Sequence, residues 1–543
     1  MRPVPPCCRV KRIIHQYALL IVLLAAVGIP LSSCITIRPL PTGQPWATST
    51  STQPLADSSP QSESLPAGYA QAVALLPAFQ GDLQGLEDIP AYSIELSVDP
   101  ALQTFQGRSR LQYTNTEDTS LERLYFRLLP NGGASYGGGT LAVSEAKVNG
   151  EVSQFNMSLD DSVLELVLPE PANPFDDLMI DFDFSGKLSG TGSDAGYSAG
   201  YGMYSHVDGT TTMAGWFPQL EVYDRDGWHL DPVYSIVDYV FSDTSFYSVD
   251  IHAPDGVILA ATGVEISKVQ TTDGTTYRFV SGPARDFVLV MSPDFKITST
   301  TVDGTTINSY SLPGHRDASK QALDIAAASV RAFNERIGQY PFTELDVVET
   351  PLRGISGVEF PGIVLIRSSY YDTPEDPVFP VLIAHEIAHQ WWYNLVGNDV
   401  FEDPWLDEAL TSYTSSLYFE QSGDRSAAAG LISYWQNDYL GALSKGQDDL
   451  VTESLAHFEN QGGSDLYGDI VYSKGALFFD ALRDEIGDEA FFQALQRYFE
   501  LNKYRIATPD DLLEQFETTA SRQLDDLYLE WLYSKQQATG DDR

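Results

Sequence analysis

The hydrophobic period of this sequence changes once, near residue 313, and that change limits the folds open to the chain. Before it, apolar and polar residues alternate with a period of two, as they do in strands with one buried face. Clear alternating runs lie at 92–98, 124–128, 180–184 and 247–251. Beyond it, residues 317–337 carry an apolar stripe with helical spacing and end at Gly338, as a helix with a glycine cap does.

This pattern predicts a multidomain protein. We expect a β-rich, antiparallel N-terminal domain over 81–312 and a mixed α/β, mostly helical domain over 313–543. Within the second domain, the short apolar runs 345–348 and 362–366 indicate buried strands, and helical patterns then continue to the end of the chain. A length of 543 residues is also more than one hydrophobic core requires.

The first 33 residues have the three zones of a bacterial export signal. A basic start is followed by an apolar stretch over 17–29, which is shorter than the ~20 residues that span a bilayer. The segment Leu31-Ser32-Ser33-Cys34 resembles a lipobox, in which the cysteine is lipidated and becomes the mature N-terminus. We expect an exported lipoprotein that is anchored to a bacterial membrane through Cys34 and faces outward. The alternative is a simple membrane anchor.

Residues 34–80 are expected to form a tether and lead-in, because Ser, Thr, Pro, Gln and Gly dominate the part up to about residue 66. Such a composition cannot bury enough apolar surface to offset the entropy of ordering. The only three cysteines are Cys7, Cys8 and Cys34, so any metal site in the folded body must use His, Asp and Glu.

The charge balance excludes one class of partner. The chain carries 75 acidic and 32 basic residues, a net charge of −43. Nucleic acids are bound by clustered Lys and Arg, so we expect no nucleic-acid partner.

The motif with the most chemical content is His385-Glu386-Ile387-Ala388-His389, within the apolar segment 378–395. In a helix, positions i and i+4 lie on one face, so both imidazoles can reach the same cation, with Glu386 beside them. Two imidazoles favour zinc over magnesium or calcium, which prefer oxygen ligands. Two ordinary histidines on a helix are the alternative.

A third ligand candidate lies downstream in Trp405-Leu406-Asp407-Glu408, at the start of a second helical pattern. Glu408 follows His389 by 19 positions (408 − 389). Two histidines and one carboxylate with an open fourth position form the arrangement of catalytic zinc sites, whereas structural sites are closed by four ligands. We expect one zinc per chain, bound by His385, His389 and Glu408.

These motifs resemble those of the gluzincin metallopeptidases of the aminopeptidase N and leukotriene hydrolase family. That family has His-Glu-x-x-His, eighteen residues, then Glu in a Trp-Leu-Asn-Glu context, and here Asp407 replaces the Asn. The segment 357–362 lies where the family has Gly-x-Met-Glu-Asn, and 472–475 where it has a Tyr before a Lys-Gly pair. The resemblance implies a saddle-like N-terminal domain and a thermolysin-like catalytic domain.

The resemblance also implies roles for individual residues. Glu386 would be the general base, and Tyr472 would donate a hydrogen bond to the oxyanion. Glu359 would accept the α-ammonium of the substrate, and Gly357 would let the backbone approach it. Val358 and Phe360 depart from the family's Met and Asn on either side of Glu359. A core tyrosine and a solvated loop carboxylate are the alternatives for Tyr472 and Glu359.

The expected function is that of an exported zinc metallopeptidase that removes N-terminal residues from peptides. Two alternatives stay open: a zinc endopeptidase or other zinc hydrolase that uses the same site, and a surface lipoprotein that retains the metal without turnover.

Overall fold

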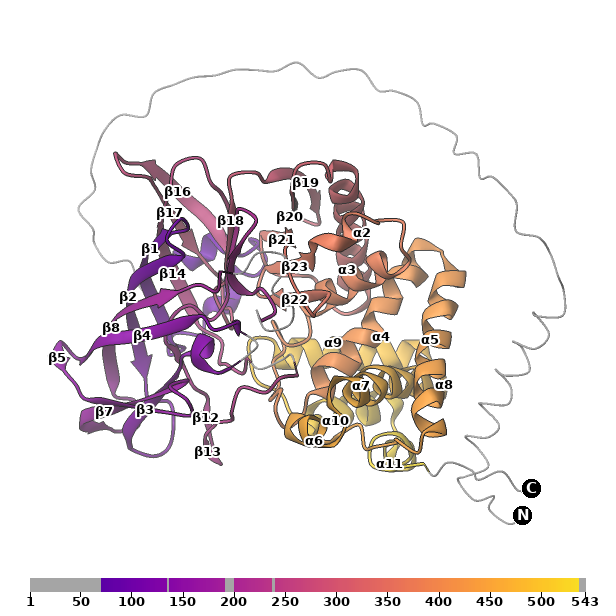
Figure 1. Ribbon diagram of the computed structural model, residues 1–543. Coiled ribbons are helices and arrows are strands. Elements are labelled where there is room, and N and C mark those ends of the chain that lie inside the picture. The colour runs from indigo at the N-terminus through magenta and orange to yellow at the C-terminus, as the bar shows by residue number, and fades with distance from the viewer. Residues whose placement is uncertain (1–69, 134–135, 191–199, 237–239, 537–543) are drawn as a thin grey trace, which may run out of the picture. The chain divides into compact units, whose positions relative to one another are not determined.

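The computed structural model describes residues 70–133, 136–190, 200–236 and 240–536 (Figure 1). The predicted export signal, Cys34 and the tether up to residue 69 lie outside these residues. Among the described residues, no helix combines the length and the apolar character that crossing a bilayer requires.

The N-terminal region is built on an eight-stranded sheet with the order β16-β17-β14-β1-β2-β8-β4-β5. The alternation predicted at 92–98 forms β1, in which Tyr92, Ile94, Leu96 and Val98 are buried. β1 pairs in parallel with β14 and antiparallel with β2. The strands of this sheet are β1 (Ala91–Asp99), β2 (Thr104–Thr114), β4 (Thr140–Val148), β5 (Glu151–Val152), β8 (Asp177–Lys187), β14 (Phe246–Ala253), β16 (Val264–Gln270) and β17 (Thr275–Val280).

Three smaller sheets complete this region, with the orders β15-β18-β10-β9, β11-β3-β7-β6 and β12-β13. Aromatic rings pack against the eight-stranded sheet: Tyr92 of β1 stacks on Tyr247 of β14 with ring centroids 5.2 Å apart, and Phe217 meets both rings edge-on. The strands are β3 (Leu121–Arg127), β6 (Phe155–Ser158), β7 (Val163–Ala172), β9 (Tyr204–Val207), β10 (Thr210–Met213), β11 (Gln219–Leu220), β12 (Tyr223–Asp224), β13 (Gly227–Trp228), β15 (Ile258–Ala261) and β18 (Leu289–Ser292).

The second region contains a five-stranded sheet with the order β19-β20-β21-β23-β22. Its strands are β19 (Lys296–Val302), β20 (Thr305–Ser311), β21 (Glu344–Thr350), β22 (Gly357–Phe360) and β23 (Ile363–Arg367). The hairpin β19–β20 precedes the domain boundary expected at 312/313, yet β20 pairs in parallel with β21 and so belongs to this sheet. Residues 74–76 of the expected lead-in also bond to this region, through the backbone of 341–343.

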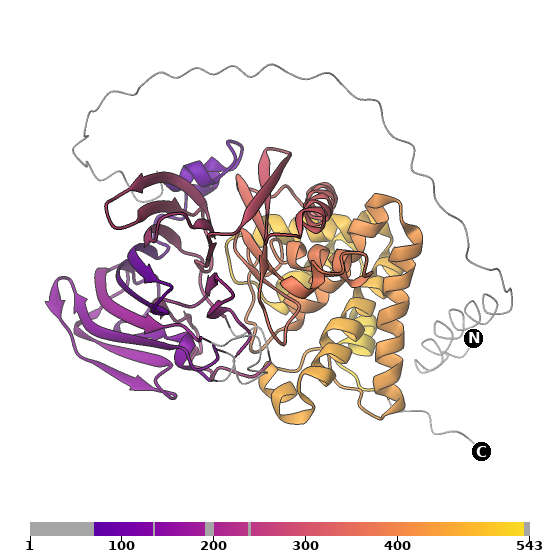
Figure 2. The same ribbon diagram turned by 45° about the horizontal axis from the view of Figure 1, so that its top comes forward.

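Helices cover this sheet and extend beyond it to the end of the described chain (Figure 2). α2 contacts α3, α4 and the hairpin β19–β20. The helices are α2 (Arg316–Arg336), α3 (Val378–Ala388), α4 (Trp405–Ser422), α5 (Arg425–Ser444), α6 (Leu455–Gln461), α7 (Gly463–Tyr467), α8 (Gly475–Ile486), α9 (Asp488–Asn502), α10 (Pro509–Ala520) and α11 (Asp525–Trp531), and a π-helix, η7 (Gly468–Lys474), lies between α7 and α8.

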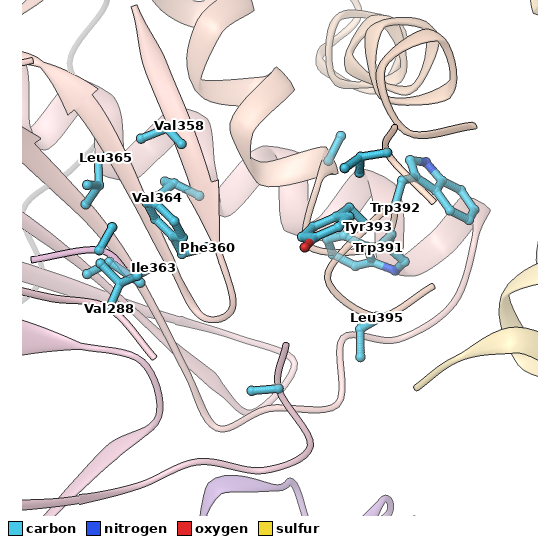
Figure 3. Packing of buried hydrophobic residues seen from close by; sticks show 14 of the residues in the cluster. Val288, Val358, Phe360, Ile363, Val364, Leu365, Trp391, Trp392, Tyr393 and Leu395 are labelled. Carbon is cyan, nitrogen blue, oxygen red and sulfur yellow. The ribbon is translucent and has the colours of Figure 1, made fainter. Parts of the chain in front are cut away.

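α3 is shorter than the apolar segment 378–395 indicated. It ends at Ala388, and Tyr393 adopts a left-handed backbone with φ of 74°. Asn394 stabilises the turn, because its side-chain amide donates to the carbonyl of His389. Trp391, Trp392 and Leu395 therefore remain buried without being helical, and the hairpin β22–β23 buries Val358, Phe360 and Ile363 (Figure 3).

A buried guanidinium joins the two regions. Arg285 precedes β18 and donates hydrogen bonds to the carbonyls of Tyr393 at 2.7 Å, Ser242 at 2.9 Å and Arg505 at 2.6 Å. Gly397 makes room for it, since a Cβ atom there would lie 2.2 Å from the Arg285 Cζ. The loop after α3 is thus fixed from the N-terminal region.

The close packing of Gly397 against Arg285 predicts that a larger residue at position 397 destabilises the protein. Gly397→Ala should lower the free energy of unfolding by about 2–4 kcal/mol, because the new methyl group displaces a buried charge from its three acceptors. Gly430→Ala is the matched control: it lies inside α5 with nothing within 4 Å of the added Cβ, so it should be neutral or slightly stabilising. Denaturant titration compares the two, and equal stabilities would contradict the proposed contact.

Candidate metal centre and catalytic cleft

The last turn of α3 presents the two histidines on one face. His385 Nε2 lies 3.2 Å from His389 Nε2, so the two ring nitrogens face a common point. Glu386, between them, is also buried. The spacing of four positions produces this arrangement directly, because the helix continues through Ala388.

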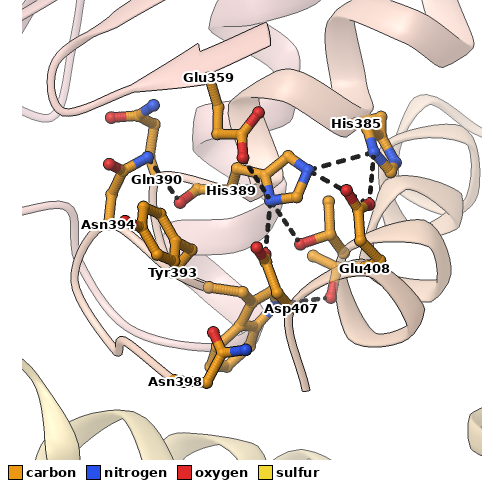
Figure 4. Close-up of polar contacts among 12 residues, drawn as sticks. Glu359, His385, His389, Gln390, Tyr393, Asn394, Asn398, Asp407 and Glu408 are labelled. Atoms are coloured by element: carbon orange, nitrogen blue, oxygen red, sulfur yellow. Dashed lines mark hydrogen bonds and ion pairs between the residues drawn. The ribbon is translucent and has the colours of Figure 1, made fainter. Parts of the chain in front are cut away.

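The first turn of α4 brings Glu408 to the same point (Figure 4). Its Oε2 atom lies 3.3 Å from His385 Nε2 and 3.6 Å from His389 Nε2. α4 begins at Trp405, a fully buried side chain that fixes the helix start against α8 through Phe478 and Phe479. All three predicted ligands therefore converge, although Glu408 comes from a separate helix.

The donor set fits a zinc ion. Two imidazole nitrogens and one carboxylate oxygen are the ligands of catalytic zinc sites, and these atoms lie close enough together to share one ion. The Oε2 atom of Glu408 is buried and makes no hydrogen bond to the described residues. Such an orphaned oxygen is costly unless a cation binds it.

The charges of the residues around the two histidines also favour the binding of a cation. Burial raises the pKa of Glu386, and the Glu359 carboxylate raises it further. Burial opposes protonation of His389, but the carboxylates of Glu359, Asp407 and Glu408 outweigh it and hold the pKa of that imidazole well above its usual range. Several buried carboxylates thus surround two imidazoles, a negative excess that a divalent ion would balance.

β22, at the edge of the five-stranded sheet, carries the predicted amine-binding glutamate. The strand alternates, so Glu359 faces the metal centre while Val358 and Phe360 point into the core. Glu359 Oε1 lies 3.8 Å from His389 Nδ1. Burial raises the pKa of Glu359 to about 8. A positively charged ligand beside it would restore the ionised form.

Gly357 has a different neighbour from the one expected. A Cβ atom at this position would lie 2.4 Å from Oε1 of Glu386 and 2.7 Å from its Cδ. The glycine therefore gives room to the predicted general base, which it brings close to the β22 backbone.

Tyr472 lies on the other side of the centre, on the π-helix η7. Its ring stacks on that of His385, with centroids 5.7 Å apart and planes 19° from parallel. Lys474 anchors the end of η7: its fully buried Nζ donates to Asp448 Oδ1 at 2.9 Å and to the carbonyls of Asp449 and Ser534. π-Helical turns are frequently found at functional sites.

An open cleft of about 690 Å³ connects these groups. Its walls include Ser356 and Glu359 on the sheet side and Trp435, Asp465 and Tyr472 on the helical side. The metal ligands and Glu386 line the cleft between the two walls. The arrangement can bind a cation, hold an extended polar substrate and move a proton at Glu386.

Two further residues shape the centre, and sequence reasoning did not assign them a role. Gln390, buried directly after His389, donates to the carbonyl of Phe360 at 3.0 Å and accepts from the Gly362 amide at 2.9 Å. It thereby ties β22 to α3. The only signal was a polar residue inside an apolar run. The second is Asp407, which contacts the imidazole of His389.

The other histidines in the described part of the chain lie outside this centre. His457 approaches Asp449 at 2.9 Å and Glu453 at 3.4 Å, through different ring nitrogens. Lys535 pairs with Asp449 as well. This group is a local network of polar contacts centred on Asp449.

Comparisons with known proteins agree with this geometry. Residues 321–531 match the Peptidase family M1 domain. Aminopeptidase M1-B of Oryza sativa subsp. japonica is 28% identical over 256 residues, which cover 44% of this chain and 28% of that protein. Aminopeptidase N of Lactobacillus helveticus is 26% identical over 253 residues, which cover 43% of this chain and 29% of that protein. The chain thus matches less than a third of the length of these relatives.

A solved structure extends the likeness to the N-terminal region. The M1 zinc metallopeptidase from Deinococcus radiodurans superposes with a TM-score of 0.61, and the match covers 83% of this chain and 94% of that one. At 19% sequence identity, this shows a shared fold. The predicted order of a β-rich region followed by a mostly helical one is confirmed.

The geometry of the metal centre predicts that Glu408 is the carboxylate that binds zinc. The purified protein should contain about one zinc per chain, and Glu408→Ala should lose most of it, because a three-ligand site becomes a two-ligand site. Glu386→Gln is the matched control, since it changes the neighbouring carboxylate and leaves the three ligands intact. Elemental analysis measures both. Glu359, Glu386 and His389 also lie close enough to share an ion; zinc lost in Glu386→Gln and kept in Glu408→Ala would assign the metal to that group.

Proposed function

Because this chain belongs to the gluzincin peptidases of the aminopeptidase N family, we propose that it is an exported zinc aminopeptidase that removes N-terminal residues from peptides. The observation that carries the proposal is the position of Glu359. This carboxylate, 12% exposed, faces the metal centre from β22 and lines the same cleft as Glu386 and the three ligands. A substrate with a free α-ammonium would satisfy it, and a blocked or internal peptide segment would not.

His385, His389 and Glu408 would hold the zinc. When bound, zinc supplies Lewis-acid polarisation and lowers the pKa of water toward ~7. Glu386 would take a proton from the attacking water and pass it to the nitrogen of the leaving amine, acting first as base and then as acid. Burial raises the pKa of its carboxyl, and a bound cation beside it would favour the ionised form that accepts the proton.

Tyr472 would stabilise the developing negative charge. Its phenol stands on the opposite wall of the cleft from Glu359, stacked on His385. A hydroxyl there can donate to the carbonyl oxygen of the scissile bond as that oxygen becomes an oxyanion. The anchoring of η7 by Lys474 keeps this donor in place.

The glutamate at 359 makes the proposal testable. Glu359→Gln should lower kcat/KM on free-amine peptides by at least about tenfold, because the substrate cation loses a partner worth about 2–5 kcal/mol. Asp465→Asn is the matched control: it removes an exposed carboxylate from the opposite wall of the same cleft and should change kcat/KM little. Steady-state kinetics on one peptide with its N-terminus free or acetylated gives the comparison.

The wild type should cleave the free peptide far better, and Glu359→Gln should discriminate much less between the two. Equal cleavage of both peptides, or cleavage at internal bonds, would contradict the aminopeptidase proposal. It would identify an endopeptidase or another zinc hydrolase instead. A zinc-loaded protein that turned over neither peptide would support a metal-retaining surface lipoprotein instead.

We propose further that the enzyme is held outside the cell by a lipid anchor at Cys34. The basic start, the short apolar stretch and the Leu31-Ser32-Ser33-Cys34 segment support this. The Ser/Thr/Pro-rich stretch that follows would separate the folded body from the membrane surface. Peptides outside the cytoplasm would then be the substrates.

Mass spectrometry of the mature N-terminus tests the anchor. In a bacterial host that processes lipoproteins, Cys34 should carry two or three acyl chains, since one chain gives only marginal binding. Cys34→Ser should abolish lipidation and normal processing, whereas Cys7→Ser and Cys8→Ser, within the export signal, should leave both unchanged. An unmodified Cys34 in a retained apolar segment would identify a simple membrane anchor.

A further inference from the structure

The imidazole of His389 is held from both sides. Its Nε2 atom faces His385 and Glu408, where the metal would bind. Its Nδ1 atom lies 2.7 Å from Oδ1 of Asp407 (Figure 4). An ionised carboxylate can only accept, so Nδ1 donates its proton in this contact, and Nε2 is the nitrogen that faces the metal position.

The contact is sealed from solvent. The side chains of His389 and Asp407 are each 1% exposed. Among the ion pairs of the described residues, Asp407 has a single partner, this imidazole. A buried carboxylate is unfavourable unless it is paired, so Asp407 and His389 constrain one another.

The backbone of α4 explains how a second acid fits beside Glu408. Asp407 and Glu408 both lie in the first turn of the helix, where the helix dipole favours negative charge. Adjacent positions on a helix point in different directions, so Glu408 reaches Nε2 while Asp407 reaches Nδ1 of the same ring. The first turn of α4 therefore contacts both ring nitrogens of His389.

Two other groups near Nδ1 make weaker contacts. The Thr411 hydroxyl lies 3.2 Å away and is neutral, and Glu359 Oε1 lies 3.8 Å away, beyond hydrogen-bond distance. Asp407 is the shortest contact and combines a hydrogen bond with a full charge. Charge-assisted hydrogen bonds are roughly twice as strong as neutral ones.

We infer that Asp407 is a positioning residue that fixes the tautomer and orientation of His389 and strengthens its bond to the metal. The family motif that this segment resembles has an asparagine here, which can accept the same hydrogen bond without the charge. Carboxylate partners of this kind raise the basicity of a ligating imidazole. This chain should therefore hold its metal more tightly than it would with an asparagine at this position. The inference rests on the proposed metal ligands and not on peptidase activity.

The affinity of the protein for zinc tests the inferred role of Asp407. Asp407→Asn keeps the size and the acceptor oxygen and removes only the charge, so the dissociation constant for zinc should rise about 10- to 100-fold. Competition with a chromophoric chelator measures this constant without any substrate. Glu420→Gln is the matched control, because it removes a carboxylate from the same helix, where it pairs with Arg483. It should leave zinc affinity unchanged.

A structural role alone would give a different result. In that case Asp407→Asn would lower the melting temperature of the metal-free protein while zinc affinity stayed at the wild-type value. That result, or an equal loss of affinity in Glu420→Gln, would overturn the inference. Thr411→Val should retain wild-type affinity; a larger loss there than in Asp407→Asn would assign the role to Thr411.

The wild-type protein provides a second measurement that does not depend on the variant folding. Nitrogen-resolved NMR of the zinc-loaded, histidine-labelled protein should show a proton on Nδ1 of His389 in a strong hydrogen bond. An Nδ1 atom without a proton would overturn the inference.

Discussion

The burial of negative charge around two imidazoles is the constraint on which the rest of the site depends. Glu359, Glu386, Asp407 and Glu408 all lie within the low-dielectric interior or at its edge, and His389 touches three of them. Such a group must either take up protons or bind a cation at its centre. Metal binding therefore stabilises the packing of α3, α4 and β22, and this packing in turn favours metal binding.

Side chains of β22 alternate between the core and the metal centre. This alternation explains why the residues that differ from the family motif leave the face toward the metal centre unchanged. Val358 and Phe360 differ from the family's residues, but both side chains are buried on the face away from the metal centre. Glu359 keeps its direction because the strand is held in register by β23 and by Gln390. These substitutions change how the hairpin packs, and the carboxylate still faces the cleft.

Local patterns carried most of what the sequence could predict. The i, i+4 spacing of His385 and His389 and the alternation of β1 both follow from the geometry of a single element, and both are confirmed as elements. Contacts between distant elements left no such signal. Nothing in the sequence indicated that Gln390 bonds to Phe360, or that α3 stops at Ala388 while its apolar run continues to Leu395. The run is apolar because the turn after α3 is buried.

The wider turn of η7 restricts how this segment can change in length. A π-helix contains one residue more per turn than its α-helical neighbours α7 and α8. Deleting one residue from η7 would let this stretch wind as an ordinary α-helix, so its side chains would project at new angles. Tyr472 would then lose its present stacking on the His385 ring. Across related sequences, the segment between α7 and α8 should therefore vary in composition while insertions and deletions are rare.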